Sequence, residues 1–239
     1  MLNNNKLKQW CLFTAVIAAV SIFMFGCAPE PVPSGPGEVE ARQFQGQNLT
    51  SIKGQRNNAL KGSQNIDRET YRLTVDGLVD HPLSLSYADL QAYPQISEES
   101  DLNCVEGWAF AAKWTGPELN GIFADAVVRP EAKIAIFYTA DDPNGYTSLD
   151  VNYLTTNNII IALKDNDITL PANRGFPFQV VAKNKLGYKW AKWVTRIELS
   201  SDTSFRGYWE KAGYNNIGDI SGPNYVPYYQ ETTTTTTGK

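Results

Sequence analysis

Cysteine and histidine, the side chains best suited to metal binding and nucleophilic catalysis, are scarce in this chain. Its 239 residues contain one histidine, His81, and three cysteines, Cys11, Cys27 and Cys104. These counts exclude a metal site with two or more histidines and a zinc site with four cysteines. Cys104 is the candidate for chemistry, because its soft sulfur suits a transition metal, whose other ligands would then have to come from a cofactor. Two alternatives stay open: a buried structural cysteine, or a nucleophile, which lacks an evident base because His81 is distant in sequence.

A strip of positive charge is the second feature. The chain is acidic overall, yet one short stretch has five basic residues and no acid: Lys183, Lys185, Lys189, Lys192 and Arg196. The pattern predicts an anion-binding strip, with a phosphate group as its candidate ligand. The alternative is a set of lysines on an exposed hairpin around Gly187. Upstream, Arg174 and Gly175 precede a predicted strand, where a side chain and backbone could approach a ligand together.

The N-terminus has the pattern of an exported protein. Lys6 and Lys8 precede an uncharged apolar run over residues 11–25. We interpret residues 1–26 as a signal peptide, because the run is shorter than the roughly 20 residues that a membrane-spanning helix needs. Residues 24–27 resemble a bacterial lipobox, which predicts that Cys27 is acylated and becomes the mature N-terminus. The alternative is an uncleaved anchor. In both cases we expect an exported protein, tethered to the cell membrane on its extracytoplasmic face.

Removing the predicted signal peptide changes both the net charge and the number of cysteines. It leaves 19 basic against 25 acidic residues, a formal net charge of −6, so nucleic acid is excluded as a partner class. It also removes Cys11, and acylation would consume Cys27. Cys104 is then the free thiol of the mature chain.

Composition divides the rest of the chain into three parts. Residues 27–66 are rich in Pro, Gly, Gln and Asn and lack apolar periodicity, which predicts a flexible tether. Residues 67–213 carry strand and helix patterns, and we expect one folded domain there. Residues 214–239 form a tail rich in Tyr, Asn and Gly that ends in six threonines, where we expect disorder.

Apolar runs within residues 67–213 predict strands, and two capped, periodic segments predict short helices. The predicted strands are 71–75, 83–85, 110–114, 133–139, 146–151, 159–163, 178–182 and 191–199, and the helices begin at Ser86 and Gly116. A tight turn at 141–145 makes the strands on its two sides antiparallel neighbours. The expected fold class is α+β with a mainly antiparallel sheet and short helices.

Six short motifs support a more specific prediction. They are residues 71–79, 104–116 with Cys-Val-Glu-Gly-Trp and Trp-Thr-Gly, 145–149, 175–177, 187–193 and 207–214. In this order and spacing they resemble the oxidoreductase molybdopterin-binding domain of the sulfite oxidase superfamily, within it the short bacterial and archaeal members. The resemblance implies the sulfite-oxidase-type fold, an oxidoreductase activity and Mo-molybdopterin as the cofactor.

The resemblance also implies which residues face the metal. Cys104 corresponds to the thiolate that binds molybdenum, whose other sulfur ligands come from the dithiolene of the pyranopterin. Tyr146 and Thr147 correspond to the segment that lines the molybdenum face. Cys104 and Tyr146 are therefore the catalytic candidates, and Thr147 is a cofactor-binding candidate.

Further cofactor contacts follow from the same resemblance. The family's Gly-Tyr-Lys-x-x-Lys segment implies that Lys192, with the backbone of Trp190 and Ala191, holds the pterin phosphate, with Lys189 nearby. Arg174 occupies a position that contacts the pterin in relatives.

Two departures from the family pattern affect the function. Gln179 stands where members usually have an arginine, so one phosphate contact is neutral here, and Arg174 is a candidate to replace it. Glu106 follows the cysteine, whereas sulfite oxidases place an arginine shortly after it for their anionic substrate. The neighbourhood of Cys104 is more similar to that of the periplasmic methionine-sulfoxide reductase catalytic subunits, which reduce an uncharged S-oxide. The N-terminal cofactor-contacting segment of those enzymes has no evident counterpart before Tyr71.

Together these features predict a membrane-tethered extracytoplasmic oxidoreductase. It would transfer an oxygen atom or electrons to or from a small molecule, with an S-oxide favoured over sulfite. A separate electron carrier, a haem- or quinone-linked protein, is implied because the chain has no haem-attachment or iron–sulfur motif. The alternative is a non-catalytic binding lipoprotein that kept the fold and lost the cofactor. Substrate, reaction direction and oligomeric state stay open.

Overall fold

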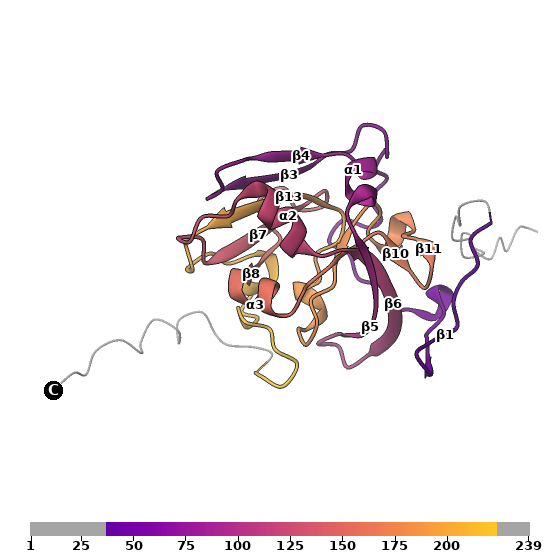
Figure 1. The fold of residues 1–239 in the computed structure, drawn as a ribbon. Helices are drawn as coiled ribbons and strands as arrows, with labels where there is room; N and C mark the ends of the chain where they lie inside the picture. Colours follow the sequence, from indigo (N-terminus) through magenta and orange to yellow (C-terminus); the bar gives the residue numbers. More distant parts are fainter. Residues whose placement is uncertain (1–36, 224–239) are drawn as a thin grey trace, which may run out of the picture. The chain divides into compact units, whose positions relative to one another are not determined.

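The computed structural model describes residues 37–223 (Figure 1). The predicted signal peptide, the lipidation site Cys27 and the threonine run lie outside the described residues. Within residues 37–223, the helices are all too short or too polar to cross a membrane.

The larger sheet has five strands in the order β4-β3-β13-β7-β8. They are β3 (Leu73–Gly77), β4 (Leu83–Leu85), β7 (Ile134–Thr139), β8 (Thr147–Asp150) and β13 (Val194–Ser200). β13 runs parallel to β3, and the other neighbouring strands are antiparallel. The predicted α+β class with a mainly antiparallel sheet is therefore confirmed.

The second sheet has the strand order β11-β10-β6-β5. Its strands are β5 (Gln95–Asn103), β6 (Ala109–Pro117), β10 (Lys164–Asp165) and β11 (Ile168–Thr169). β5 and β6 form a hairpin with nine paired positions, which Figure 1 shows as a long curved ribbon. The sequence analysis did not predict β5, because acidic residues interrupt its apolar alternation. It forms a strand because its backbone pairs along the whole of β6, whose apolar side chains reach the core.

Short elements complete the described fold. They are α1 (Tyr87–Ala92), α2 (Leu119–Ala126), α3 (Val151–Thr156) and α4 (Tyr208–Lys211), the 3-10 turns η1 (Ile52–Gly54), η2 (Ala172–Arg174) and η3 (Gly187–Lys189), the pair β1 (Gln43–Phe44) and β2 (Gln47–Asn48), and the pair β9 (Ile161–Ala162) and β12 (Gln179–Val180). The capping box predicted for α1 is present, because Ser86 and Asp89 exchange side-chain and backbone hydrogen bonds.

The buried side chains form one continuous cluster with contributions from both sheets and from α1 and α2. Trp114 of β6 and Trp190, which follows η3, are both buried, and their ring centroids are 5.7 Å apart. This packing joins the β5–β6 hairpin to the segment that contains the lysines. The loop with Cys104 and the lysine segment are therefore parts of one packed body.

Residues 37–66 differ from the prediction of a flexible tether. The side chain of Glu38 accepts hydrogen bonds from the backbone nitrogen and hydroxyl of Thr169, at 3.0 and 2.7 Å. The Thr50 nitrogen donates to Ala111 of β6 at 2.9 Å, and Ile52 is buried. The tether interpretation is wrong for these residues. Their order comes from separate long-range contacts, which leave no periodic pattern in the sequence.

The chain also continues to pack beyond residue 213. The Leu186 nitrogen donates to Gly218 at 2.7 Å, and the Tyr188 hydroxyl donates to Asn215 at 2.7 Å. The first ten residues of the predicted tail, 214–223, thus lie against η3 and the loop before it.

Candidate active site

Cys104 lies in the loop that connects β5 to β6. The loop is closed by two backbone hydrogen bonds, from the Cys104 nitrogen to Trp108 at 2.8 Å and from the Gly107 nitrogen to Cys104 at 3.1 Å. Gly107 has a φ of +82°, a conformation that glycine adopts without strain. Cys104 therefore lies on a tight loop directly before β6.

The Cys104 thiol is free and half-buried. Burial raises its pKa above the ordinary value, because removal from water disfavours the thiolate; the charge of Glu106 acts in the same direction. Nearby backbone N–H groups and the positive charge of Arg56 oppose this rise in pKa only partly. A thiolate at this position would therefore be stabilised by a bound metal ion.

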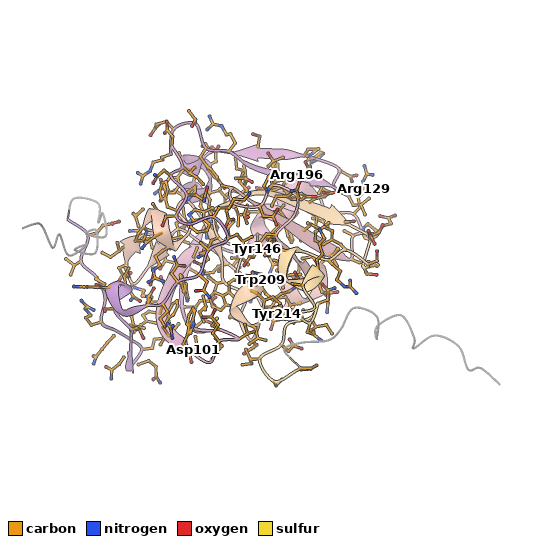
Figure 2. All side chains as sticks on the ribbon, turned by 180° about the vertical axis from the view of Figure 1, so that it is seen from behind. Asp101, Arg129, Tyr146, Arg196, Trp209 and Tyr214 are labelled. Atoms are coloured by element: carbon orange, nitrogen blue, oxygen red, sulfur yellow. The ribbon has the colours of Figure 1, made fainter. Side chains whose placement is uncertain are left out.

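Cys104 faces a pocket with about 730 Å³ of empty space, open solvent at its mouth included. Most of its wall is aromatic or aliphatic: Leu102, Val105, Trp108, Phe110, Trp114, Tyr146, Tyr188, Trp190, Trp209 and Tyr214. Its polar residues are Arg56, Asn57, Asn58, Glu106, Arg174, Gln179 and Lys192. Figure 2 labels Tyr146, Trp209 and Tyr214, which lie near one another in the middle of the described region. An apolar pocket with a few convergent polar groups is typical of a cofactor or substrate site.

The pocket contains five of the eight candidate catalytic and cofactor-binding residues: Cys104, Tyr146, Arg174, Trp190 and Lys192. These five come from the β5–β6 loop, the loop before β8, η2 and the segment after η3. It also contains Glu106 and Gln179, the two departures from the family pattern. Burial raises the pKa of Tyr146, and the negative charges of Glu210 and Asp141 raise it further.

Three predicted residues do not line the pocket. Thr147 is buried and donates to Glu210 at 2.6 Å, and Lys189 is buried in an ion pair with the same carboxylate oxygen at 2.6 Å. Ala191 uses both backbone groups inside the fold, because its nitrogen donates to Lys189 and its carbonyl accepts from Val180. These residues support the pocket wall from behind.

The predicted anion-binding strip is not present as a strip. Four of its five basic residues pair with carboxylates of this chain: Lys183 with Glu98, Lys185 with Asp219, Lys189 with Glu210, and Arg196 with Asp76 and Glu198. The alternative, a set of lysines on an exposed hairpin, is also wrong, because Lys189 is fully buried. Apart from Glu198, these acids lie at least 21 residues from their basic partners in sequence, so the local charge pattern could not reveal them.

Lys192 is the member of this group that reaches the pocket. Its ammonium donates to the Asn57 side chain and the Asn58 carbonyl, and lies 4.5 Å from the ring centroid of Trp193. Burial, together with the charge of Arg174, lowers the pKa of Lys192 to about 7. Gly175 makes this position possible, because a Cβ there would lie 3.0 Å from Cβ of Lys192. Gly175 thus admits a lysine side chain.

Arg174 holds the N-terminal segment against the pocket. Its terminal nitrogens donate to the carbonyls of Arg56 at 2.8 Å, Ile52 at 3.1 Å and Gln55. Its Nε is buried and has no hydrogen-bond partner among the described residues. Arg174 therefore keeps its Nε donor for a ligand, while its terminal nitrogens fix the backbone of residues 52–56.

Residues 52–60, which we call the N-terminal strap, are the part of the site that the sequence analysis missed. Asn57 and Asn58 contact Lys192, and the Asn58 side chain also donates to Glu106 at 3.1 Å. The segment was interpreted as part of a tether, so no N-terminal contact to the site was predicted. The sequence signal that could have indicated this part of the site was weak, because it consists of two adjacent asparagines in a polar stretch.

The fold and the pocket together define a class of protein. Among residues 37–223 there is no group of three or more His, Cys, Asp or Glu side chains that could hold a metal ion. The pocket offers one thiol at one place and amine, guanidinium and amide donors at another. This donor set fits a cofactor that brings its own metal ligands and an anionic group, in an α+β redox domain.

The chain belongs to the oxidoreductase molybdopterin binding domain family, which residues 60–209 match. It is 33% identical over 153 residues to a candidate protein-methionine-sulfoxide reductase subunit, YedZ1, of Azospira oryzae, which covers 64% of this chain and 57% of the relative. It is 31% identical over 154 residues to the uncharacterized oxidoreductase YuiH of Bacillus subtilis, covering 64% of this chain and 76% of the relative. The sulfane dehydrogenase SoxCD of Paracoccus pantotrophus has a similar fold, with a TM-score of 0.56 and 24% identity over 59% of this chain and 41% of the SoxCD chain.

Membership confirms the expected superfamily, its fold and Mo-molybdopterin as the cofactor. The residues of the pocket fit this group. Cys104 is the thiol in the pocket wall that could serve as the sulfur ligand from the protein, and Lys192, Gln179 and the unpartnered Nε of Arg174 are donors that could hold a phosphate.

Proposed function

We propose that this protein is an extracytoplasmic, membrane-tethered oxidoreductase that reduces a small S-oxide. The observation that carries the proposal is one pocket that combines the Cys104 thiol with the donors of Lys192 and Arg174. The similarity to YedZ1, named as a candidate methionine-sulfoxide reductase subunit, supports an S-oxide as the substrate class. The proposed attachment to the membrane is supported by the lipobox-like sequence pattern at Cys27.

Each residue has a proposed role in this reaction. Cys104, as the thiolate, would hold molybdenum, while Lys192, Arg174 and Trp190 would hold the pterin and its phosphate. Tyr146 lies on the wall near Cys104, where its hydroxyl can orient the substrate. Thr147 and Lys189 position this wall through Glu210. When bound, the cofactor supplies the two-electron redox chemistry.

The reaction balances as one S-oxide, two electrons and two protons giving one thioether and one water. A separate haem- or quinone-linked protein supplies the electrons. Glu106 supports an S-oxide over sulfite, because it places a negative charge at the pocket where an anion-binding arginine would serve sulfite. Both its carboxylate oxygens are already hydrogen-bonded, to Trp108 at 2.8 Å and to Asn58.

A binding lipoprotein without catalysis is the second candidate. Gln179 favours it, because a neutral amide in the pocket wall replaces an arginine that relatives use. Arg174 replaces this arginine only in part, because three of its hydrogen bonds go to backbone carbonyls of the strap and not to a ligand.

Molybdenum content separates the two candidates. Protein made in a molybdenum-competent host should contain one molybdenum per chain, and Cys104→Ser should lose it. Cys27→Ser is the control, because it should keep the metal while losing attachment to the membrane fraction. A folded, metal-free wild-type protein would contradict the enzyme and favour the binding lipoprotein.

A further inference from the structure

Trp209 of α4 and Tyr214, which follows α4, are two aromatic residues that line the pocket of Cys104. Both side chains are half-buried, and their ring centroids are 5.5 Å apart with the ring planes at 76°. The ring of Tyr188, which lines the same pocket, lies 5.3 Å from that of Tyr214. These three rings, which we call the aromatic cluster, form a continuous apolar part of the pocket wall.

The fold holds the aromatic cluster in place. Gly213 has a φ of +100°, which turns the chain back after α4, and the Tyr214 nitrogen donates to the Trp209 carbonyl at 3.1 Å. The Tyr188 hydroxyl donates to the carbonyl of Asn215 at 2.7 Å. Rings that are fixed before binding lose little conformational entropy when a ligand packs against them.

The part of the pocket wall that α4 provides is uncharged. Glu210 follows Trp209 directly, but its side chain is buried in the ion pair with Lys189 and does not line the pocket. Within residues 37–223, the charged residues that line this pocket lie on other segments and are Arg56, Glu106, Arg174 and Lys192. An uncharged aromatic surface favours an apolar group, and a thioether sulfur also makes favourable contacts with aromatic rings.

The aromatic cluster adjoins Tyr146, the residue proposed to orient the substrate. The backbone nitrogen of Tyr208 in α4 donates to the Tyr146 carbonyl at 2.9 Å. A hydrogen bond from the Trp209 side chain opposes the rise in the pKa of Tyr146. The donors assigned to the pterin phosphate come from other elements of the fold. This arrangement favours contact of the aromatic cluster with the substrate over contact with the phosphate.

We propose that the aromatic cluster is a specificity-determining subsite, in which Trp209 and Tyr214 bind the apolar group next to the sulfur of the substrate. The preferred substrates are then uncharged S-oxides with a large apolar arm, such as a phenyl ring, and dimethyl sulfoxide is a poor substrate. This inference rests on the proposed function and names its substrate class. The sequence analysis included both residues in the motif at 207–214 and assigned them no role.

Two S-oxides that differ in one arm test the proposal, methyl phenyl sulfoxide and dimethyl sulfoxide. In the molybdenum-loaded enzyme, KM should be lower for the phenyl compound. Tyr214→Ala should raise that KM by roughly fivefold to tenfold, as expected for the loss of an aromatic contact, and leave KM for dimethyl sulfoxide and kcat for both unchanged. Tyr214→Phe should behave like the wild type, because it keeps the ring. Tyr214 is varied because Trp209 also bonds to Tyr146.

Tyr208 provides the matched control. Its ring lies 5.2 Å from that of Trp209, but it is 48% exposed and does not line the pocket. Tyr208→Ala should leave both KM values unchanged. An equal rise for the two sulfoxides in Tyr214→Ala, or no rise for the phenyl compound, would overturn the subsite. A rise in Tyr214→Phe as large as in Tyr214→Ala would also overturn it, because the hydroxyl and not the ring would then matter.

A binding measurement keeps this test separate from the proposed activity. Calorimetric titration uses methyl phenyl sulfone and dimethyl sulfone, which carry one more oxygen than the two sulfoxides. Wild type and Tyr208→Ala should bind the phenyl sulfone more tightly, and Tyr214→Ala should lose most of this preference. If the loaded enzyme reduces neither sulfoxide, the proposed function fails, and the titration still decides the role of the aromatic cluster. Equal affinity of the wild type for the two sulfones, or an unchanged preference in Tyr214→Ala, would refute the subsite.

Discussion

The ion pair of Lys189 and Glu210 has no exposed side-chain surface on either partner. Thr147 donates to the same carboxylate oxygen, and the second oxygen has no partner among the described residues. Burial lowers the pKa of Lys189, although the Glu210 charge opposes this. Buried pairs add little net stability, but the loss of one partner costs about 3–5 kcal/mol because it leaves a buried charge. The pair therefore serves to lock η3, β8 and α4 together behind Tyr146.

Asp165 is a second buried group, and it makes stability depend on pH. Burial raises the pKa of Asp165 from 3.8 to about 7. The charge of Glu40 adds to this rise, whereas a hydrogen bond from Gln55 and the charge of Arg174 oppose it. Between these two pKa values the folded state binds more protons than the unfolded state. The stability from this group is thus fully present below pH 4 and is lost as the pH rises to 7. The contribution of Asp165 to the free energy of unfolding changes by up to about 1.4 kcal/mol per pH unit.

Asp165→Asn should remove this dependence, because an amide does not titrate and can still accept the hydrogen bond from Gln55. Urea unfolding between pH 4 and 7 should show the wild type losing stability relative to the variant as the pH rises. Asp101→Asn, at an exposed carboxyl, is the control and should follow the wild type. A constant difference between wild type and Asp165→Asn across this range would show that Asp165 titrates normally.

At the scale of elements, Gly116 determines how closely β6 approaches β9. A Cβ at this position would lie 2.1 Å from the carbonyl oxygen of Ile161 and 2.8 Å from Cα of Ala162. Both are backbone atoms, so the strands would have to separate. The two-stranded pair β9–β12 carries Gln179 into the pocket, and the contact at Gly116 therefore helps to place the pocket wall.

Gly116→Ala should destabilise the protein by at least about 2 kcal/mol, as overpacking against backbone does. Gly121 in α2 is the matched control, since a Cβ there would make an ordinary contact of 3.5 Å with Tyr93. Gly121→Ala should be neutral or up to about 1 kcal/mol more stable, because alanine favours the helix. Urea midpoints of the two variants measure this, and similar midpoints would contradict the close packing of β6 on β9.

At the scale of the whole molecule, the N-terminal segment is part of the domain. Leu49 and Ile52 are buried, Gln55 donates to Asp165 at 3.0 Å, and Arg174 binds three strap carbonyls. Burial of each large apolar side chain contributes about 1.5–3 kcal/mol. Removal of the segment would also leave the buried Asp165 and Arg174 without partners.

A chain that begins at residue 67 should therefore be at least about 3 kcal/mol less stable than one that begins at residue 37. Denaturant unfolding of the two chains gives this difference directly. The shorter chain should also lose the interactions that hold Lys192 and Glu106 at the pocket mouth. Equal stabilities would restore the interpretation of residues 37–66 as a tether.

Local patterns were sufficient for most elements of the domain. Alternating or continuous apolar runs identified strands such as β3, β7 and β13, and the capping box identified α1. β5 was missed because its strand character comes from pairing with β6, so it is a property of two segments. The scarcity of cysteine and histidine, with the spacing of the six motifs, was enough to select Cys104 and the cofactor class.

The sequence by itself thus determined the α+β class, the family and Cys104 as the candidate metal ligand. These follow from residue types and local spacing, which the chain carries before it folds. The tertiary structure decided which charges remain available: it paired four of the five basic residues between Lys183 and Arg196 with distant acids, placed Lys192 in the pocket, and brought Arg56 next to Trp108. The reason is that the effect of a charge depends on its partners and its burial, and both are set by contacts between residues far apart in the chain.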